Sequence, residues 1–515
     1  MVQPNSQPRH PAARHGRPPA PATLGELRAD GHVYRSVKEE IRQNLLTRMR
    51  AGQDRFPGII GFDNTVLPHL ERALLAGHDV ILLGERGQGK TRLIRTLAGL
   101  LDEWAPAVAG CEINDHPFVP VCARCRRLTE ELGEDLPIVW RNARDRYGEK
   151  LATPDTSVGD LIGDIDPVKV AEGRTLGDPE TVHFGLVPRT NRGIFCLNEL
   201  PDLAERIQVA LLNVLEERDI GVRGYALRLP LDLILVASAN PEDYTNRGRI
   251  ISPLKDRFGA EIRTHYPLTL DDELGLIRQE AVVGWDGAVP GAELPEHLVE
   301  VIARFTRLVR ESPAVDSRSG VSARFAIAAA EGAAASAVRR SALADSVATR
   351  PGPASRRGGT SRGSHRASAG STATPAAEQP VARVCDLPAI VGTLRGKVEF
   401  EVSEEGREEE VLAHLLRRAI AETFRARLGS ADLSPLLAKF DGGQTVESGE
   451  LIPASDLLQR VGEVPGLAKI MQRLGMDGGE SFGHAAAAIE FALEGLYLMR
   501  RLSKDTMEGT SVYRT

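Results

Sequence analysis

The sequence predicts an α/β fold with a parallel sheet, followed by a helical lid domain and a helical C-terminal region. Two observations indicate the sheet. The runs GIFCL (193–197) and LDLILVASA (231–239) are apolar on both faces, as strands buried between two layers of helices are. Between them, LAERIQVALLNVLEE (203–217) has apolar residues at helical spacing. Such alternation of strands and helices is typical of an α/β core.

Changes of composition along the 515 residues divide the chain into five regions. The Pro-rich beginning is too polar to build a core, and a later stretch rich in Gly, Ser and Arg loses apolar periodicity altogether. After that stretch, segments such as EEEVLAHLLRRAIAETFRARL are again periodic. We expect a disordered N-terminus (1–24), an α/β core (25–270), a helical lid (271–340), a disordered linker (341–380) and a helical C-terminal region (381–515).

Net charge and cysteine content argue against several classes of protein. A net charge of −7 and a pI near 6.0 give no sign of a chain that binds nucleic acid or anionic membranes through its overall charge. Five cysteines in so long a chain fit a reducing compartment. The N-terminus lacks the order of a signal peptide, and no apolar run approaches the ~20 residues that span a bilayer. We therefore expect a soluble, cytoplasmic protein with no membrane partner and no nucleic-acid partner.

The loop GERGQGKT (84–91) matches the P-loop pattern at each of its defined positions. Its glycines let backbone N–H groups point at phosphate oxygens, Lys90 supplies charge to the β- and γ-phosphates, and the Thr91 hydroxyl can ligate Mg²⁺. A chance glycine-rich turn is the alternative, but the strand DVILL before the loop and the helix TRLIRTLAGLL after it favour a P-loop. We expect ATP and Mg²⁺ to bind at Gly84, Glu85, Arg86, Gly87, Gln88, Gly89, Lys90 and Thr91.

Further motifs follow the P-loop in a fixed order: SVGDLIGDIDPVKV, HFGLVPRTNRGIFCLNELPDL, VASANPE, ISPLKDRFGAEI and RSGVSARFAI. From about residue 55 to 330, this series resembles the AAA+ ATPases, in particular the branch that contains the MoxR proteins and the ATPase subunit of magnesium chelatase. The resemblance implies an AAA+ core, a helix-2 insert at 158–186 that engages partners, and assembly into a homo-oligomeric, hexameric ring.

By this resemblance, GIFCLNEL falls at the Walker B position, at the end of a buried strand. In the family, an Asp there orients Mg²⁺ and its water, and the adjacent Glu activates the attacking water. Glu199 is in place, whereas Asn198 replaces the Asp. The Asn198 amide still accepts a hydrogen bond from a Mg²⁺-bound water, so we expect weakened metal binding and slow turnover rather than none.

Three more residues take catalytic roles by resemblance. Asn240 in VASANPE corresponds to sensor 1, which reads the γ-phosphate, although it can also simply end a strand. Arg257 in ISPLKDRFGAEI corresponds to the arginine that reaches a neighbouring subunit's nucleotide, and an ordinary surface arginine is the alternative. Arg324 in RSGVSARFAI is the first choice for sensor 2 and Arg318 the second, with a structural role as the alternative.

Residues 105–135 depart from the compact AAA+ pattern. In CEINDHPFVPVCARC, Cys122 and Cys125 form a CxxC knuckle, preceded by Cys111 and His116. Two thiolates at this spacing can face one tetrahedral ion, and an upstream Cys and His complete four ligands, with Asp115 as a substitute for His116. The pattern predicts a structural Zn²⁺. Free thiols in a loop and a redox CxxC are the alternatives.

Taken together, these features predict a ring-forming ATPase that couples ATP hydrolysis to remodelling of a partner protein. By resemblance, that partner carries a von Willebrand factor A domain. One alternative is a nucleotide-dependent scaffold with little hydrolysis, because Asn198 lacks the charge that helps to hold Mg²⁺. A second alternative is a genuine magnesium chelatase ATPase subunit. The remodelled substrate does not follow from the sequence.

Overall fold

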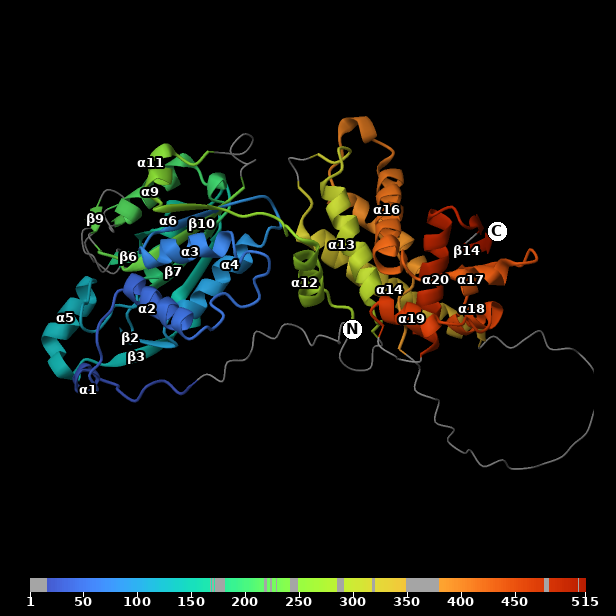
Figure 1. Ribbon diagram of the computed structural model, residues 1–515. Helices are drawn as coiled ribbons and strands as arrows, with labels where there is room; N and C mark the ends of the chain where they lie inside the picture. The colour runs from blue at the N-terminus through green and yellow to red at the C-terminus, as the bar shows by residue number, and fades with distance from the viewer. Residues whose placement is uncertain are drawn as a thin grey trace, which may run out of the picture. The chain divides into compact units, whose positions relative to one another are not determined.

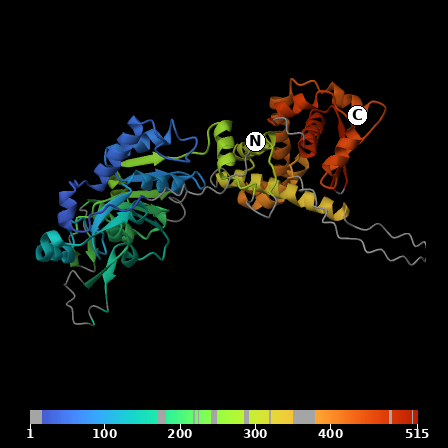
Figure 2. The same ribbon diagram turned by 90° about the horizontal axis from the view of Figure 1, so that it is seen from below.

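The computed structural model separates into two compact units, which are described one at a time (Figures 1 and 2). The N-terminal unit comprises residues 12–269, and the C-terminal unit contains residues 270–515. The structure describes residues 16–166, 168, 171, 181–216, 220–222, 225–227, 229–240, 249–284, 291–316, 320–348, 379–476, 481–507 and 509–515. The predicted N-terminal tail and linker lie mostly outside these ranges.

A five-stranded sheet forms the centre of the N-terminal unit, and all of its described pairings are parallel. In sheet order the strands are β11 (Ala260–Arg263), β1 (Val80–Leu83), β10 (Leu233–Ala239), β7 (Gly193–Asn198) and β4 (Tyr147–Leu151). Every residue of β1, β7 and β10 is buried. The predicted α/β fold with a parallel sheet is therefore confirmed.

Alternate residues of each strand point to opposite faces of the sheet and build two separate cores. Val80 and Leu82 belong to the core that packs against α2, α3 and α4, whereas Ile81 and Leu83 belong to the core that packs against α6, α9 and α11. Figure 1 shows these helices around the strands. Their bounds are α2 (Val37–Arg50), α3 (Val66–Leu75), α4 (Lys90–Thr96), α6 (Val158–Leu161), α9 (Glu205–Glu216) and α11 (Ser252–Arg257).

A buried ion pair holds the beginning of β4 against α2. Both Arg146 Nη atoms donate to the Glu40 carboxylate at 2.8 and 2.7 Å, and Arg146 Nε donates to the Arg192 carbonyl at 2.6 Å. Both side chains of the pair are at most 3% exposed. Removing either partner would leave a buried charge without compensation, which typically costs about 3–5 kcal/mol. Loss of either partner would therefore destabilise the sheet edge formed by β4.

Two inserts extend from this core. The antiparallel pair β2 (Trp104–Val108) and β3 (Ile138–Asn142) carries α5 (Ala123–Leu132) between its strands, within the predicted 105–135 insert. The antiparallel pair β5 (Gly163–Ile165) and β6 (Val182–Phe184) forms the base of the predicted helix-2 insert. Most of residues 167–180 lie outside the described part of the chain.

The N-terminal unit also contains shorter elements. They are α1 (Leu24–Ala29), α8 (Leu186–Arg189) and the antiparallel hairpin of β8 (Ile220–Val222) and β9 (Tyr225–Leu227).

The C-terminal unit is mainly helical and has one continuous core. Its helices are α12 (Leu270–Glu280), α13 (Glu296–Arg310), α14 (Ala323–Ala348), α15 (Pro388–Leu394), α16 (Glu408–Leu428), α17 (Ser434–Leu437), α18 (Ala454–Val461), α19 (Leu467–Arg473) and α20 (Phe482–Leu498). Helix α13 packs on α16, and α14 packs on α15, so the segments before and after residues 349–378 form one body. The sequence analysis treats these segments as two regions, because periodicity identifies an apolar helix face and not its partner.

A small antiparallel sheet in the C-terminal unit was not expected from the sequence. Its strands, in sheet order, are β12 (Val446–Gly449), β14 (Thr510–Arg514) and β13 (Ser503–Met507).

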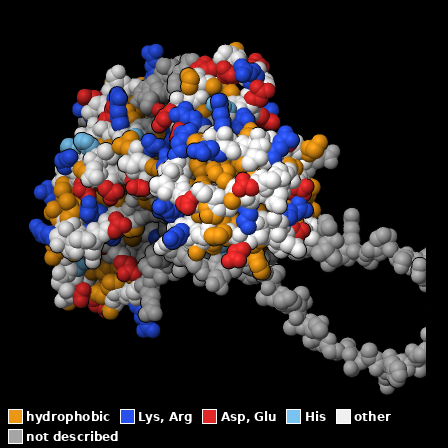
Figure 3. All heavy atoms as spheres, turned by 45° about the vertical axis from the view of Figure 1, so that its right-hand side comes forward, with side chains coloured by type: hydrophobic (Ala, Val, Ile, Leu, Met, Phe, Trp, Pro, Cys, Tyr) orange, Lys and Arg blue, Asp and Glu red, His pale blue; other side chains and the backbone are white. Residues whose placement is uncertain are grey.

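On the face drawn in Figure 3, Lys and Arg side chains lie among Asp and Glu side chains. Within the described part of the chain, no helix is both long and apolar enough to cross a membrane.

Candidate nucleotide site and metal cluster

The P-loop connects the end of β1 to the beginning of α4, and its backbone requires glycine at several positions. Gly87 and Gly89 have φ angles of 74° and 81°, in the left-handed region that side chains with a Cβ rarely adopt. At Gly84, an added Cβ would lie 1.9 Å from Thr264 Oγ1 and 2.2 Å from Gln88 Oε1. The tight curvature of the loop therefore depends on these three glycines.

Residues that follow the neighbouring strand β11 hold the loop in place. Thr264, directly after β11, donates from its backbone N to Leu83 O at 2.7 Å and from Oγ1 to Gln88 Oε1 at 2.7 Å. The Tyr266 hydroxyl donates to the carbonyl of Arg86 at 2.8 Å. These contacts restrict the loop, which lowers the cost of ordering it when a ligand binds.

The Lys90 ammonium lies inside the loop. It donates to the carbonyl of Glu85 at 2.8 Å and to the carbonyl of Gly84, and the side chain is buried. Thr91, in the first turn of α4, is partly buried. An ammonium and a hydroxyl beside a loop of backbone N–H groups are the donor set that binds a polyphosphate and its Mg²⁺. The residues present therefore fit the predicted cofactors.

Asn198 and Glu199 follow each other at the carboxyl end of β7. Glu199 has a φ of 55°, a left-handed conformation that is strained for a residue other than glycine. Its backbone N donates to Ser238 Oγ at 3.4 Å, and Ser238 Oγ donates to Asn198 Oδ1 at 3.1 Å. Ser238, on β10, thus connects both residues to the neighbouring strand.

Asn240 is buried and comes directly after β10. Strand β10 lies between β1 and β7, and Ala239 is opposite Leu83, the last residue before the P-loop. Because the carboxyl ends of parallel strands meet at one edge of a sheet, the P-loop, Asn240 and the Asn198–Glu199 pair lie side by side. This edge is where open α/β sheets bind their ligands.

A charged residue that the sequence analysis missed lies next to Asn198. Asn198 Nδ2 donates to Glu149 Oε1 at 2.8 Å, and Glu149 belongs to the neighbouring strand β4. Arg95 of α4 donates to both Glu149 oxygens at 2.9 Å, and the Tyr147 hydroxyl donates to Oε2 at 3.0 Å. Hydrogen bonding to Arg95 lowers the pKa of Glu149 below its ordinary value, so this carboxyl group is ionised at neutral pH.

The predicted arginines belong to elements other than the strands of this edge, or lie outside the described residues. Arg257 is exposed in the last turn of α11. Arg324 is exposed near the beginning of α14, in the C-terminal unit. Arg318, the second choice for sensor 2, lies outside the described residues. The roles of Arg257 and Arg324 stay predictions.

The cysteines of the 105–135 insert form a buried cluster with one carboxylate. The ligand atoms of Cys111, Asp115, Cys122 and Cys125 all lie within 4.8 Å of one another. Asp115 Oδ2 accepts from the backbone N of Val121 at 3.0 Å and of Cys122 at 2.8 Å. The other oxygen, Oδ1, is buried and has no hydrogen-bonding partner of ordinary geometry among the described residues. An unpaired buried oxygen beside three sulfur atoms fits a bound cation.

Protonation within the cluster is uneven. Hydrogen bonds from Cys122 and Cys125 lower the pKa of the Cys111 thiol to about 3, whereas burial raises the pKa of Asp115 to about 6. Donating those hydrogen bonds to Cys111 raises the pKa values of Cys122 and Cys125. A metal ion would displace these protons, because thiolates and carboxylates are the ligand forms.

His116 does not belong to the cluster, which corrects the predicted ligand set. Its Nδ1 accepts from the backbone N of Phe118 at 3.1 Å, and its Nε2 lies 3.3 Å from Nε2 of His32. The ring stacks on His32 and meets Tyr34 edge-on, with centroids 5.5 and 4.9 Å apart. Asp115, the substitute considered in the sequence analysis, takes the place of His116, because adjacent side chains on this turn point in different directions.

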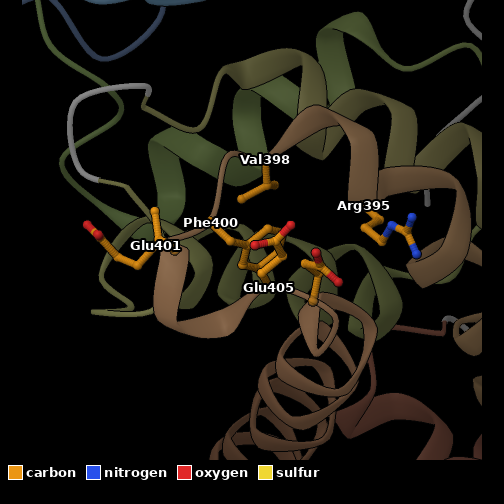
Figure 4. Close-up of a pocket in the computed structure, with 7 residues that line it drawn as sticks. Arg395, Val398, Phe400, Glu401 and Glu405 are labelled. Carbon is orange, nitrogen blue, oxygen red and sulfur yellow. The ribbon is translucent and has the colours of Figure 1, made fainter.

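The C-terminal unit has a separate hollow with a volume of about 350 Å³ (Figure 4). It is lined by Arg395, Val398, Phe400, Glu401, Val402, Glu405 and Glu408. Three carboxylates against one guanidinium repel phosphate groups, and the lining contains no glycine-rich loop. This hollow therefore does not compete with the P-loop as a nucleotide site.

Sequence comparison finds relatives, although no family model matches the chain. The magnesium-chelatase 38 kDa subunit of Acidiphilium rubrum is 30% identical over 223 residues, which are 41% of this chain and 57% of that protein. The magnesium-chelatase subunit ChlI of Cyanophora paradoxa is 32% identical over 190 residues, 36% of this chain and 51% of that protein. Over these residues the chain is similar in sequence to magnesium chelatase subunits.

This chain spans about half the length of the curated relatives it matches. Among solved structures, a cryo-EM-based model of the complex between subunits BchI and BchD of magnesium chelatase superposes with a TM-score of 0.33 at 22% identity. That superposition covers 57% of this chain and 89% of the other. The similarity to magnesium chelatase subunits therefore rests on the sequence relatives.

Proposed function

We propose that this protein is an ATPase that uses ATP hydrolysis to remodel a partner protein. One observation carries the proposal: the P-loop, Asn240 and the Asn198–Glu199 pair lie together at the carboxyl edge of β1, β10 and β7. This edge combines groups that bind phosphate with a carboxylate that can take a proton from water. The AAA+ similarity supports the same reading.

Each residue of the edge has a distinct task in this proposal. Lys90 offsets the charge of the β- and γ-phosphates, and Thr91 holds Mg²⁺, which supplies charge neutralisation at the transferred phosphoryl group. Glu199 accepts the proton of the attacking water, and Asn240 orients that water. Asn198 and Ser238 fix the end of β7, so that Glu199 is held in position.

In this proposal the active form is a homo-oligomeric, hexameric ring. Arg257 acts on the nucleotide of a neighbouring subunit, where its charge stabilises the transition state, and Arg324 acts as sensor 2. The exposure of both side chains leaves them accessible for such contacts. The partner is a protein with a von Willebrand factor A domain, and a cytoplasmic location stays a prediction of the sequence.

An ATPase assay with three variants tests the proposal. The parent chain hydrolyses ATP, and Glu199→Gln lowers the rate by about 100-fold or more while ATP still binds, because a general base contributes this much. Lys90→Ala abolishes binding. Glu205→Gln, an exposed glutamate at the start of α9, is the matched control and keeps the parent rate. A Glu199→Gln variant as fast as the control would refute the catalytic role.

Two alternatives have specific support. The neutral Asn198 favours a nucleotide-dependent scaffold, in which ATP binds tightly and neither the parent nor Glu199→Gln turns over. The names of the relatives favour a genuine magnesium chelatase subunit. Reconstitution with the other subunits of a magnesium chelatase distinguishes this second alternative, since only a genuine subunit supports Mg²⁺ insertion into a porphyrin.

We also propose that the cluster of Cys111, Asp115, Cys122 and Cys125 holds a structural Zn²⁺. Three thiolates and one carboxylate are acceptable tetrahedral ligands, and all four residues are buried. The cluster joins the turn after β2 to the beginning of α5, where Cys122 is the N-cap residue. A bound ion would therefore stabilise the whole insert.

A further inference from the structure

The neutral Walker B position has a carboxylate on the adjacent strand. Strand β4 runs parallel to β7 with Leu151 opposite Asn198 and Glu149 opposite Cys196. Side chains two residues apart in a strand share one face, so Glu149 and Asn198 lie on the same face as Cys196. Cys196 belongs to the core that contains residues of α4, the helix that follows the P-loop. Glu149 therefore faces that helix.

The contact between Glu149 and Arg95 brings the carboxylate to the face of α4 that carries the expected Mg²⁺ ligand. Arg95 follows Thr91 by four residues, so both side chains lie on one face of α4, about 6 Å apart along the helix axis. Arg95 donates to both oxygens of Glu149. Glu149 thus contacts a side chain on the same face of α4 as the Thr91 hydroxyl.

Asn198 is matched to the charge of Glu149. Its Nδ2 donates to Glu149 Oε1 and its Oδ1 accepts from Ser238, which sets the orientation of the amide. An aspartate at position 198 would instead place two carboxylates 2.8 Å apart. Asn198 and Glu149 together therefore carry one negative charge and share one hydrogen bond. An aspartate at position 198 with a glutamine at position 149 would carry the same charge and could form the same kind of hydrogen bond.

We propose that Glu149 supplies, from strand β4, the negative charge that an aspartate at position 198 would provide for Mg²⁺. The inference rests on the proposed binding of ATP and Mg²⁺ at the P-loop. Mg²⁺ in nucleotide sites keeps several waters and is held through one or two carboxylates. Glu149 is a positioning residue in this scheme, because it acts on the hydration shell of the ion.

Arg95 is then a competing counter-ion for Glu149. The four hydrogen bonds from Asn198, Arg95 and Tyr147 fill the acceptor sites of the carboxylate, so one donor must leave before a Mg²⁺-bound water can bind. The Arg95 side chain is 60% exposed, and exposed ion pairs are weak. Arg95 is therefore the donor that moves away when Mg²⁺ and nucleotide bind.

Nucleotide binding by the full chain, with and without Mg²⁺, tests the inference. The Kd of a fluorescent ATP analogue is measured in EDTA and in Mg²⁺. The Kd in EDTA divided by the Kd in Mg²⁺ gives a ratio that is large when Mg²⁺ strengthens binding. Glu149→Gln is expected to reduce this ratio by about 10-fold or more, the usual effect of losing a group that supports a metal site. The charge-transposed variant Asn198→Asp/Glu149→Gln is expected to recover most of that loss.

Two further variants separate this role from a merely structural ion pair. Glu261→Gln removes an ion-paired glutamate from β11, at the opposite edge of the same sheet, and leaves the ratio unchanged. Arg95→Gln removes the competitor and keeps or increases the ratio. If Arg95 and Glu149 form only a structural ion pair, Arg95→Gln and Glu149→Gln should change the ratio in the same direction. Thermal melting of each variant verifies that it is folded.

The outcomes distinguish this inference from the proposed function. A parent chain that binds no nucleotide, like Lys90→Ala, overturns both. A parent chain that shows Mg²⁺-dependent binding, with Glu149→Gln equal to Glu261→Gln, overturns the role of Glu149 and leaves the ATP site intact. A ratio that falls in Arg95→Gln as it does in Glu149→Gln also overturns that role.

Discussion

Replacement of Asn198 by aspartate gives a quantitative prediction that needs no ligand. The substitution exchanges the hydrogen bond from Asn198 Nδ2 to Glu149 Oε1, 2.8 Å long, for contact between two carboxylates. At this distance two full charges repel by about 6 kcal/mol at an effective dielectric constant of about 20. The actual loss of stability is smaller, because one of the two carboxylates can take up a proton. Raising a carboxyl pKa from about 4 to 7, so that the group is half protonated at pH 7, costs about 4 kcal/mol.

Partial exposure of Glu149 and its contact with Arg95 reduce this figure further. We therefore expect Asn198→Asp to lower the free energy of unfolding by about 2–4 kcal/mol at pH 7. The folded state raises the pKa of the carboxylate pair above its unfolded value. The folded chain then binds more protons than the unfolded chain, so the variant loses stability as the pH rises from about 4 to 7.

Urea unfolding followed by tryptophan fluorescence measures this effect, since Trp104 and Trp140 lie on β2 and β3 of the N-terminal unit. The double variant Asn198→Asp/Glu149→Gln restores a single charge and should regain the parent stability and its pH profile. An Asn198→Asp chain as stable as the parent at both pH 6 and pH 8 would show that the two side chains do not interact as described.

Two other predictions concern the C-terminal unit and the cysteine cluster. His297 is fully buried on α13, and burial lowers its pKa to about 3. Since the unfolded chain binds more protons between pH 6.5 and 3, the parent should lose about 2 kcal/mol of stability from this group between pH 7.5 and 5. His297→Leu should lack that loss in urea unfolding followed by circular dichroism, and an unchanged pH dependence would contradict the assignment. For the cysteine cluster, metal analysis of the purified parent protein should find about one equivalent of zinc. Cys122→Ser should contain less than about half an equivalent, and the control Cys385→Ser should contain as much zinc as the parent. Zinc contents that are equal in the two variants would contradict the site.

The sequence predicts the nucleotide edge well because its signals are local. The P-loop pattern, the apolar runs ending at Asn198 and Asn240, and their alternation with helices follow from short stretches of chain. In a parallel sheet these strand ends must meet at one edge. The order of the strands then places β10 between β1 and β7, which brings the predicted residues side by side.

Glu149 escapes sequence reasoning because its role depends on which strand lies beside β7. The stretch YGEKL has no motif, and its register against GIFCLN is a tertiary property. Its signal is a charged residue in a short strand candidate that precedes the helix-2 insert. Such a residue points to a metal-supporting role only after Asn198 is seen to lack the negative charge of an aspartate.

The cysteine cluster shows the limit of spacing arguments within a turn. Three cysteines were grouped correctly, but the choice between Asp115 and His116 depends on the backbone of a single turn. Asn114 has a φ of 55°, in the left-handed region, directly before these two residues. This conformation directs Asp115 toward the sulfur atoms and His116 toward the aromatic rings, and no sequence periodicity reveals it.

The common core of the C-terminal unit likewise depends on distant contacts. Arg340 donates to both oxygens of Asp386 at 3.0 and 2.9 Å, and both side chains are buried. These residues lie on opposite sides of the predicted linker. Helical periodicity identified the flanking segments, whereas their pairing follows from contacts between residues far apart in the chain.

Hydrolysis that depends on Glu199 tests the central claim most directly. In a steady-state assay with saturating ATP and Mg²⁺, the parent chain and Glu205→Gln should turn over, slowly but measurably. Glu199→Gln should bind ATP and hydrolyse it at least about 100-fold more slowly. Equal rates for Glu199→Gln and the parent, or tight ATP binding without turnover in the parent chain, would contradict the account.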